Sequence, residues 1–341
     1  MTINIKKHAM DLSTSYLGLK LKSPVIVGSS GLTTSVENLK KIESSGAGAV
    51  VLKSIFEEEI YNEYRSILEK EKDQEFPDTR FLDYYDYKIK DDNIKRFLEL
   101  IKTAKKEIDI PVVASINCVS SWEWSFFAKK LEEAGADAIE LNLFILPSDF
   151  DKNCQEVEDT YLKIIKQITE AVKIPVSVKM SYYFADLAAF VQKVSKSGVK
   201  GIVLFNRFFH PDFDIDNFKV VPTNVLSHSS DLAISLRWMS IMSGRVDCDL
   251  IASTGVHDGK SIIKEILAGA DSVQMVSALY KNGIDSITGM LEDVKSWMRK
   301  HNFEKLDDFR GKMSQKNSPN PAEYERVQFM RYFDTKKYDL D

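Results

Sequence analysis

The sequence predicts a (β/α)8 barrel, a TIM barrel with long insertions after its second and sixth strands and a C-terminal arm. One observation is a sequence pattern that recurs four times, in which a small residue, a glycine and two mostly small residues precede an aliphatic run. Its glycines are Gly46, Gly135, Gly198 and Gly269. Each follows an amphipathic stretch, so it marks a helix that ends on a left-handed glycine and turns directly into a buried strand. Repeated returns of this kind build a parallel sheet.

A second observation is the number of short apolar runs that follow turns or caps. We expect strands at residues 24–28, 49–53, 112–117, 138–143, 176–180, 201–205, 249–253 and 272–276. Helical spacing of apolar residues is clearest at residues 36–42 and 162–168. Eight strands alternating with helices is the barrel pattern. A doubly wound open sheet is the alternative, but it needs a glycine-rich turn after its first strand, and the sequence has no Gly-x-Gly-x-x-Gly.

Two connections between the predicted strands are too long to be simple loops. Residues 54–91 follow the second strand and are acidic and aromatic, and residues 206–230 follow the sixth strand. Long insertions after barrel strands lie on the face where barrel enzymes do their chemistry. We expect a single domain with its barrel core at about residues 11–311 and a polar C-terminal extension at residues 312–341.

The composition is that of an ordinary globular protein. The chain has 341 residues, 44% hydrophobic and 28% charged, so it can bury a large core. A net charge of −5 without a basic cluster argues against nucleic acid, and no apolar run reaches the length of about 18 residues that a membrane span needs. Residues 1–11 lack the apolar region of a signal peptide. Cys118, Cys154 and Cys248 form no metal motif, so we expect no metal site and a cytoplasmic location.

Polar side chains mark the ends of several predicted strands. Lys53 and Lys179 each end a buried apolar strand, and asparagines stand at the ends of three others: Asn117, Asn142 and Asn206. In a barrel these positions point into the active site. Because a buried unpaired ammonium is unfavourable, each lysine needs an acceptor, an anion or a path to solvent. Two cations beside several amides suit a planar heteroaromatic ligand with a delocalised negative charge, such as a reduced flavin.

A phosphate group is expected at the last two turns of the barrel. Thr254-Gly255-Val256 and Ser277-Ala278 offer backbone N–H groups where helices are predicted to start. These turns are the usual phosphate position in such barrels.

The motifs resemble those of the dihydroorotate dehydrogenase family, a group of FMN-dependent barrels, over nearly the whole chain. The similar segments begin at residues 17–24, end at residues 308–311 and include Glu140-Leu141-Asn142-Leu143 and Gln274 to Leu279. The resemblance implies that FMN is held by Ser30, Gly31, Lys53, Ser54, Asn117, Asn142, Lys179, Gly255 and Ser277. Thr254, which replaces a family glycine in the phosphate turn, is expected to bind FMN with them. It places Lys179 at the flavin N1 edge. It also implies that Lys53 and Asn142 act in catalysis and that Lys53, Asn142 and Asn206 bind the substrate.

The sequence departs from the family where the substrate chemistry is expected. Family members carry a cysteine or serine base after the fourth strand, and this chain has Ile145 or Leu146 at that position. Neither side chain can accept a proton. We expect Asp149, on the same loop, to act as the base instead. Other polar side chains on the predicted rim loops are those of Cys118, Ser148, His210 and His228.

The functional hypothesis is an FMN-dependent oxidoreductase resembling dihydroorotate dehydrogenase. It would transfer hydride from dihydroorotate, or a related dihydropyrimidine, to flavin N5 in pyrimidine biosynthesis. Two alternatives stay open: a non-flavin barrel enzyme such as an aldolase, with a Schiff base on Lys179 or Lys53, and a flavin-binding protein without turnover. The resemblance to the soluble class implies a homodimer. Fumarate, NAD through a partner subunit and quinone stay open as electron acceptors.

Overall fold

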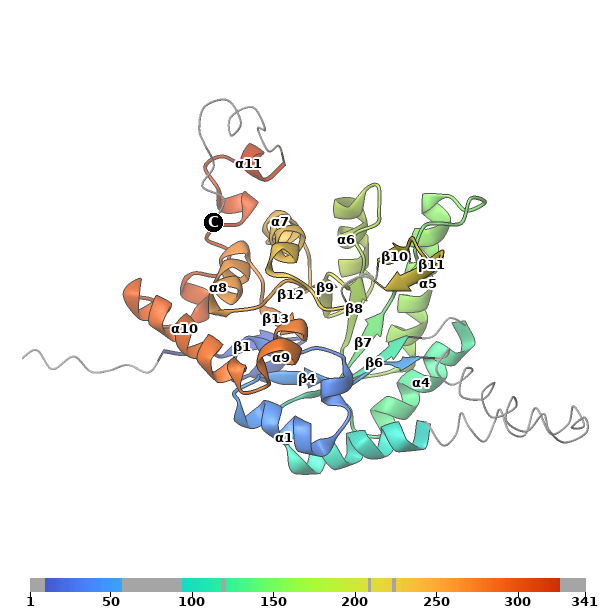
Figure 1. Ribbon diagram of the computed structural model, residues 1–341, viewed down its shortest axis with the longest axis horizontal. Coiled ribbons are helices and arrows are strands. Elements are labelled where there is room, and N and C mark those ends of the chain that lie inside the picture. The colour runs from blue at the N-terminus through green and yellow to red at the C-terminus, as the bar shows by residue number, and fades with distance from the viewer. Residues whose placement is uncertain (1–9, 57–93, 118–120, 208–209, 223–224, 326–341) are drawn as a thin grey trace, which may run out of the picture.

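Eight parallel strands form a closed ring at the centre of the molecule (Figure 1). The computed structural model of the chain describes residues 10–56, 94–117, 121–207, 210–222 and 225–325. Around the ring the strands are β4 (Ala49–Val51), β3 (Val25–Val27), β13 (Ser272–Met275), β12 (Asp249–Ser253), β9 (Gly201–Leu204), β8 (Val176–Met180), β7 (Ala138–Asn142) and β6 (Val112–Asn117). Since β4 also pairs with β6, the ring closes. The predicted barrel and all eight strands are confirmed.

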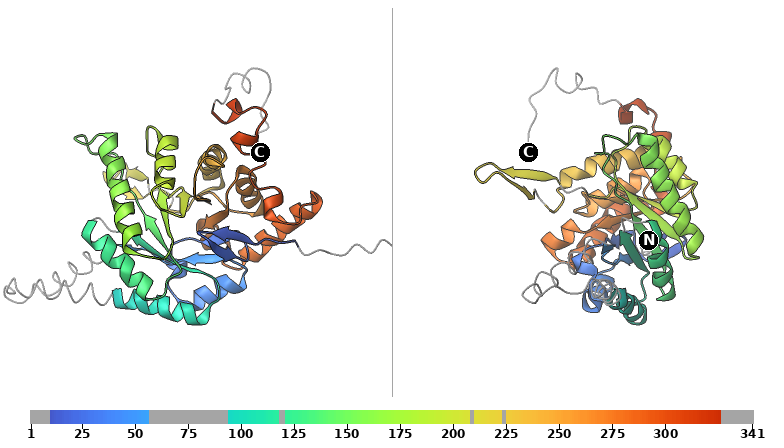
Figure 2. Two further views of the ribbon diagram at one scale, coloured as in Figure 1. Left: turned by 180° about the vertical axis from the view of Figure 1, so that it is seen from behind. Right: turned by 90° about the vertical axis from the view of Figure 1, so that its right-hand side faces the viewer.

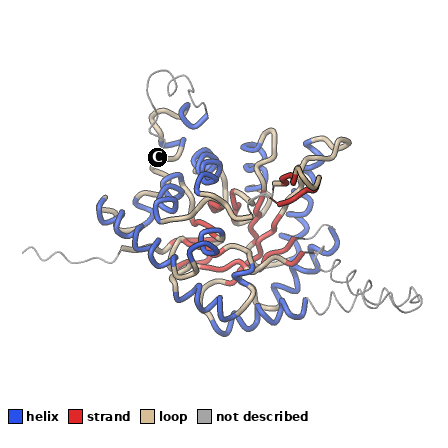
Figure 3. The backbone as a smooth tube through the Cα atoms, viewed as in Figure 1, coloured by secondary structure: helices blue, strands red, loops and turns tan. Residues whose placement is uncertain are grey.

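Helices surround the ring of strands on the outside (Figure 3). They are α1 (Val36–Ser44), the helical residues 94–107, α4 (Ser121–Glu133), α5 (Cys154–Ala171), α6 (Leu187–Ser195), α7 (Leu232–Met242), α8 (Gly259–Ala268) and α10 (Ser286–Lys300). Shorter helical turns are η1 (Gly31–Thr33), η2 (Ser229–Asp231), α9 (Ser277–Asn282) and η3 (Leu306–Asp308). The helical patterns predicted at residues 36–42 and 162–168 lie within α1 and α5.

The four glycine caps predicted from the recurring sequence pattern are present. Gly46, Gly135, Gly198 and Gly269 have φ angles of +100°, +97°, +98° and +119°. Glycine adopts this left-handed backbone without the steric penalty that a Cβ would bring. The caps therefore turn each helix directly into the next strand.

An N-terminal hairpin that the sequence did not predict covers one end of the barrel. It consists of β1 (Thr14–Tyr16) and β2 (Leu19–Leu21), which pair antiparallel. Tyr16, Leu17 and Leu21 are buried in a cluster with strand residues such as Ile26 and Val203. The space beside Gly201, the first residue of β9, is filled by the side chain of Leu17. The hairpin thus covers the N-terminal ends of the strands and leaves the C-terminal ends for a functional site.

The insertion after the sixth barrel strand contains a second antiparallel hairpin. It is formed by β10 (Pro211–Asp214) and β11 (Lys219–Pro222) and projects from the barrel (Figure 2). The insertion after the second barrel strand is described only at its start, where β5 (Ile55–Phe56) pairs with β6. Residues 57–93 lie outside the described residues.

The described part of the C-terminal arm packs against the barrel. It runs through η4 (Gln315–Asn317) to α11 (Ala322–Glu325), and both turns contact α7. Arg245, just after α7, donates a hydrogen bond to Gln315 Oε1 at 2.6 Å. No helix in the described ranges is long and apolar enough to cross a membrane.

Candidate active site

Three adjoining cavities lie at the C-terminal ends of the barrel strands, and two of them, A and B, border Lys179. Cavity A has a volume of about 420 Å³ and is lined by Ser29, Ser30, Lys53, Ser54, Phe56, Asn117, Glu140, Asn142, Phe144, Lys179, Asn206 and Arg207. Cavity B has a volume of about 220 Å³ and is lined by Ser29, Lys179, Asn206, Arg207, Val225, Leu226, Ser227, Ser253, Thr254, Gly255, Val256, Gln274, Met275, Val276, Ser277 and Tyr280. The four residues common to both sets show where the cavities meet.

The structure brings together most of the site residues that the sequence predicted. Those around cavity A are Ser30, Lys53, Ser54, Asn117, Asn142, Lys179 and Asn206. Those around cavity B are Thr254, Gly255 and Ser277, again with Lys179 and Asn206. Gly31 follows Ser30 at the start of η1, where a Cβ would lie 2.8 Å from the Tyr280 hydroxyl. The roles of these residues toward FMN stay a prediction.

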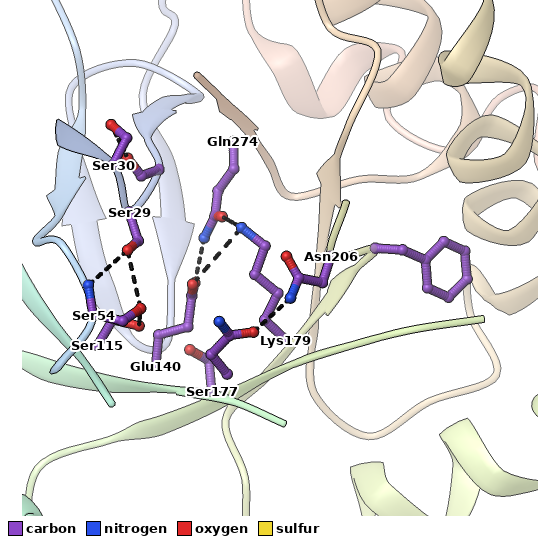
Figure 4. A network of polar contacts seen from close by, with 12 residues as sticks. Ser29, Ser30, Ser54, Ser115, Glu140, Ser177, Lys179, Asn206 and Gln274 are labelled. Atoms are coloured by element: carbon purple, nitrogen blue, oxygen red, sulfur yellow. Dashed lines mark hydrogen bonds and ion pairs between the residues drawn. The ribbon is translucent and has the colours of Figure 1, made fainter. Parts of the chain in front are cut away.

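A buried polar network holds Lys179 in the wall that the two cavities share (Figure 4). Lys179 Nζ donates to Gln274 Oε1 at 2.9 Å, and Gln274 Nε2 donates to Glu140 Oε2. Lys179 Nζ also lies 3.9 Å from Glu140 Oε1. Lys179 is 8% exposed and Glu140 is fully buried. The predicted strand-end ammonium is therefore paired with a carboxylate and still borders both cavities.

Glu140 and Gln274 belong to the site, although no sequence pattern predicted a role for either residue. The available signal was a charged or amide residue in the middle of a buried apolar strand, Ile139-Glu140-Leu141 in β7 and Val273-Gln274-Met275 in β13. Buried polar groups in such positions need partners. Glu140 and Gln274 contact each other across the barrel, so the sequence around either residue could not identify this contact.

Hydroxyl groups tie three strands together on the other side of cavity A (Figure 4). Ser29 Oγ accepts a hydrogen bond from the Ser54 backbone N–H at 2.9 Å and lies 3.1 Å from Ser54 Oγ. Ser54 Oγ lies 2.8 Å from Ser115 Oγ on β6. The loops after β3 and β4 are thereby fixed relative to β6.

Two asparagine amides at neighbouring strand ends are oriented by each other. Asn206 Nδ2 donates to Asn142 Oδ1 at 2.7 Å. Asn142 ends β7, and Asn206 follows β9. The bond leaves the Asn142 amide N–H donors and the Asn206 carbonyl oxygen for a ligand in cavity A.

Asp149, the predicted base, is not brought to this site. It is exposed on the loop between β7 and α5, where its carboxylate accepts from the Asp151 N–H at 3.1 Å and pairs with Lys152 at 3.3 Å. The hydrogen bond from Asp151 and the Lys152 ammonium lower the pKa of Asp149. A carboxylate stabilised in this way is a weaker proton acceptor. Asp149 and its two partners thus form a local cluster on the exposed loop.

The loop itself begins on a rigid support. Tyr161 of α5 is buried, and its hydroxyl accepts from the Ile145 N–H at 3.0 Å and donates to the Leu143 carbonyl oxygen at 3.2 Å. Burial raises the pKa of Tyr161 to about 12, so its hydroxyl is neutral at physiological pH. Tyr161 thus fixes the backbone of residues 143–145, where this loop begins. Cys118 lies outside the described residues.

The expected phosphate turn differs from the prediction in one respect. Thr254-Gly255-Val256 does not start a helix, because α8 begins at Gly259 and is capped by the Asp258 side chain, which accepts from the Ser261 N–H. Thr254 and Gly255 instead have φ angles of +80° and +82°. A Cβ on Gly255 would lie 2.1 Å from the Leu232 nitrogen, so only glycine fits there. Thr254 tolerates the left-handed backbone while its hydroxyl donates to the Phe205 carbonyl oxygen at 3.1 Å.

The donor sets of the two cavities fit FMN. Cavity A offers lysine and amide groups to the polar edge of a planar ring, and cavity B offers serine hydroxyls and a glycine turn to a phosphorylated side chain. Among the described residues, Glu140 Oε1 is a buried oxygen without a hydrogen-bond partner, and such an oxygen is typical of a ligand-binding site. Three cations and one carboxylate line cavity A, so its described wall is positively charged.

Comparison with known proteins gives consistent matches over the barrel. A family model described as dihydroorotate dehydrogenase matches residues 11–298. The chain is 29% identical to the dihydroorotate dehydrogenase B (NAD(+)) catalytic subunit of Thermoplasma volcanium, over 88% of this chain and 98% of the relative. It is 26% identical to the subunit of the same name from Methanocaldococcus jannaschii, over 86% and 95% of the two chains. With that of Pyrococcus abyssi the identity is 24%, over 88% and 98%.

Proposed function

The chain belongs to the dihydroorotate dehydrogenase family, and on that premise we propose that it is an FMN-dependent oxidoreductase that takes hydride from dihydroorotate in pyrimidine biosynthesis. The observation that carries the proposal is the Lys179 ammonium, buried in the wall that cavities A and B share. A cation in this position stabilises the negative charge that a flavin gains when it is reduced.

Each part of the site has a distinct task in this proposal. FMN supplies the hydride acceptor when it is bound. Lys179 holds a positive charge at the polar edge of the ring, and Gly255 and Ser277 line the cavity that suits the phosphate. Asn142 and Asn206 present amide groups to the substrate ring, while Lys53 and Arg207 give cavity A the positive charge that a substrate carboxylate requires.

The contacts of Lys179 argue against the Schiff-base alternative for this residue. Its Nζ donates to Gln274 and pairs with Glu140. A covalent bond from Nζ to a carbonyl carbon would need the neutral amine and would disturb both contacts. The FMN proposal keeps them.

Anaerobic reduction by dihydroorotate tests the proposed function. We expect the FMN-reconstituted protein to lose its visible flavin absorbance when dihydroorotate is added without oxygen. Asp149→Asn serves as the control and should react at the wild-type rate, because Asp149 is exposed and paired with Lys152. If Asp149→Asn reacts more slowly than the wild type, Asp149 would again be the candidate proton acceptor. Bound FMN that stays oxidised would mean a flavin protein without dihydroorotate turnover, and no FMN uptake would refute the proposal as a whole.

We propose NAD as the terminal electron acceptor, reached through a partner subunit. The relatives that support this are named NAD(+)-type catalytic subunits, a name that implies a second subunit. A cytoplasmic location is part of the proposal and is consistent with the free Cys154 and Cys248.

We also propose that the protein is a homodimer and that the β10–β11 hairpin forms its interface. Opposed residues of an antiparallel pair share a face, so Phe213 lies beside Val220, and Pro211 beside Pro222. Phe213 and Val220 are each 69% exposed. Asp212 and Asp214 occupy the opposite face. A two-stranded sheet with an exposed apolar face is marginal alone, so a second copy of the same face would bury it without burying a carboxylate.

Polar substitution on this face is expected to separate the dimer. The double variant Phe213→Ser/Val220→Thr should lower the mass measured by light scattering from two chains to one. Met313→Ser is the control, because Met313 is also an exposed apolar residue but lies on the C-terminal arm. A monomeric wild type, or a double variant that stays dimeric at the same concentration, would contradict this interface.

A further inference from the structure

Glu140 is a buried carboxylate that the proposed reaction does not use directly. It is fully buried in β7, lines cavity A and lies within ion-pair distance of Lys179. One of its oxygens, Oε2, accepts from Gln274, and the other has no hydrogen-bond partner among the described residues (Figure 4). Burying a carboxylate is unfavourable, and an amide or apolar residue would avoid that cost. Its presence beside the functional cation therefore calls for an explanation.

Glu140 determines how Gln274 is oriented. A carboxylate can only accept a hydrogen bond, and an ammonium can only donate one. Gln274 must therefore turn its Nε2 toward Glu140 and its Oε1 toward Lys179, which is the arrangement observed. The amide cannot flip without opposing donor to donor at Lys179. Glu140 is thus a positioning residue that acts on Lys179 through Gln274 as well as through charge.

We propose that Glu140 lowers the reduction potential of bound FMN by partly cancelling the positive charge of Lys179. This inference rests on the proposed function. Opposite charges about 4 Å apart form a dipole, and in a buried site the field of each is weakly screened. The field that Lys179 exerts on a ligand in cavity A is therefore smaller than that of a lone ammonium. Reduced FMN is stabilised less, so it passes its electrons on more readily.

Glu140→Gln tests the charge while keeping an acceptor for Gln274. The measurement is the potential of the FMN-loaded protein, equilibrated without oxygen against a reference dye. We expect the ratio of reduced to oxidised FMN at a fixed potential to rise at least tenfold, which for a two-electron couple is a positive shift of about 30 mV. A role limited to hydrogen bonding would leave the potential unchanged, and an unchanged or lower potential would overturn the inference.

Glu158→Gln is the matched control. Glu158 is also a buried glutamate paired with a lysine, with its Oε2 2.8 Å from Lys193 Nζ, but it lies on α5 and does not line cavity A or B. Its replacement removes one buried carboxylate without changing the charge beside Lys179. We expect its potential to equal that of the wild type. A shift as large as that of Glu140→Gln would show a general charge effect and overturn the assignment to Glu140.

A variant that keeps the carboxylate protects the test against loss of folding. Glu140→Asp shortens the side chain by one methylene, which moves the negative charge away from Lys179, and is expected to raise the ratio of reduced to oxidised FMN at a fixed potential by less than Glu140→Gln does. If Glu140→Gln yields no folded flavoprotein, a lower or unchanged potential in Glu140→Asp overturns the inference. Failure of the wild type to bind FMN would instead refute the proposed function on which the inference rests, so the two failures are distinguishable.

Discussion

Replacement of Lys179 by methionine is expected to destabilise the cofactor-free protein by about 3–5 kcal/mol, because it leaves Glu140 as an uncompensated buried charge. Glu140 is fully buried, and Lys179 is its only ion-pair partner among the described residues. Methionine preserves the length and apolar character of the lysine stem. The loss therefore reports the unpaired carboxylate rather than a cavity.

The double variant Lys179→Met/Glu140→Gln separates charge from packing. It removes both charges, so we expect it to regain most of the stability lost in Lys179→Met. The free energy of unfolding in urea, measured without FMN, gives the comparison. A Lys179→Met variant as stable as the wild type, or a double variant no more stable than the single one, would show that the pair does not stabilise the barrel as described.

The second large effect concerns the pH dependence of stability and the buried Glu265 of α8. Neither carboxyl oxygen of Glu265 has a hydrogen-bond partner among the described residues. Burial raises its pKa to about 8, and the nearby Ser235 hydroxyl opposes the rise only in part. The folded protein therefore favours the protonated acid, whereas the unfolded chain loses this proton near pH 4.5. Stability is present below pH 4.5 and is lost as pH rises to 8, by about 4 kcal/mol over the interval.

Glu265→Met should remove this slope. Between pH 6.5 and 8 we expect the variant to gain about 1.5 kcal/mol relative to the wild type, because only the wild type continues to lose stability through this group. This pH range lies above the pKa of the buried Asp271 carboxyl, which is raised to about 6. Urea unfolding at each pH is the measurement. Glu292→Gln is the control, since the pKa of this exposed carboxyl is lowered by Lys295 and it is ionised throughout this pH range. Parallel curves for Glu265→Met and the wild type would contradict the prediction.

The two effects illustrate different uses of a buried carboxylate. Glu140 faces a cation and lines a cavity, so its charge can act on a ligand. Glu265 lies among helices away from the cavities, where a charge has no compensation. We expect replacement of Glu265 to change stability and leave the flavin potential unchanged. Glu140 should affect the potential through Lys179.

The barrel and most of the residues that line the cavities could be predicted from the sequence, because the signals for them are local. Strand and helix patterns arise within a few residues of one another, and a glycine with positive φ is required wherever a helix turns directly into a strand. Strand ends in a parallel barrel all point to one face, so Lys53, Asn142 and Lys179 could be placed together from their positions alone. The resemblance to a known family added the expected cofactor.

Loops and exposed elements could not be read in the same way. Asp149 follows β7 in sequence, but it lies exposed on its loop, where Asp151 and Lys152 satisfy its carboxylate locally. The β10–β11 hairpin has the alternating pattern of a strand pair, yet it lies within an insertion that the barrel pattern does not constrain. The start of α8 at Gly259 is set by the capping side chain of Asp258, two residues beyond the predicted Thr254-Gly255-Val256 turn.

By itself the sequence determined the barrel, its strands, the glycine caps and the polar residues at the strand ends. Only the tertiary structure decided how Lys179 is paired, because Gln274 is 95 residues from Lys179 and 134 from Glu140 along the chain. Periodicity encodes which face of an element is buried, since that depends on neighbours three or four residues away. Which buried groups meet across the barrel depends on how the ring of strands closes, and no local pattern records that closure.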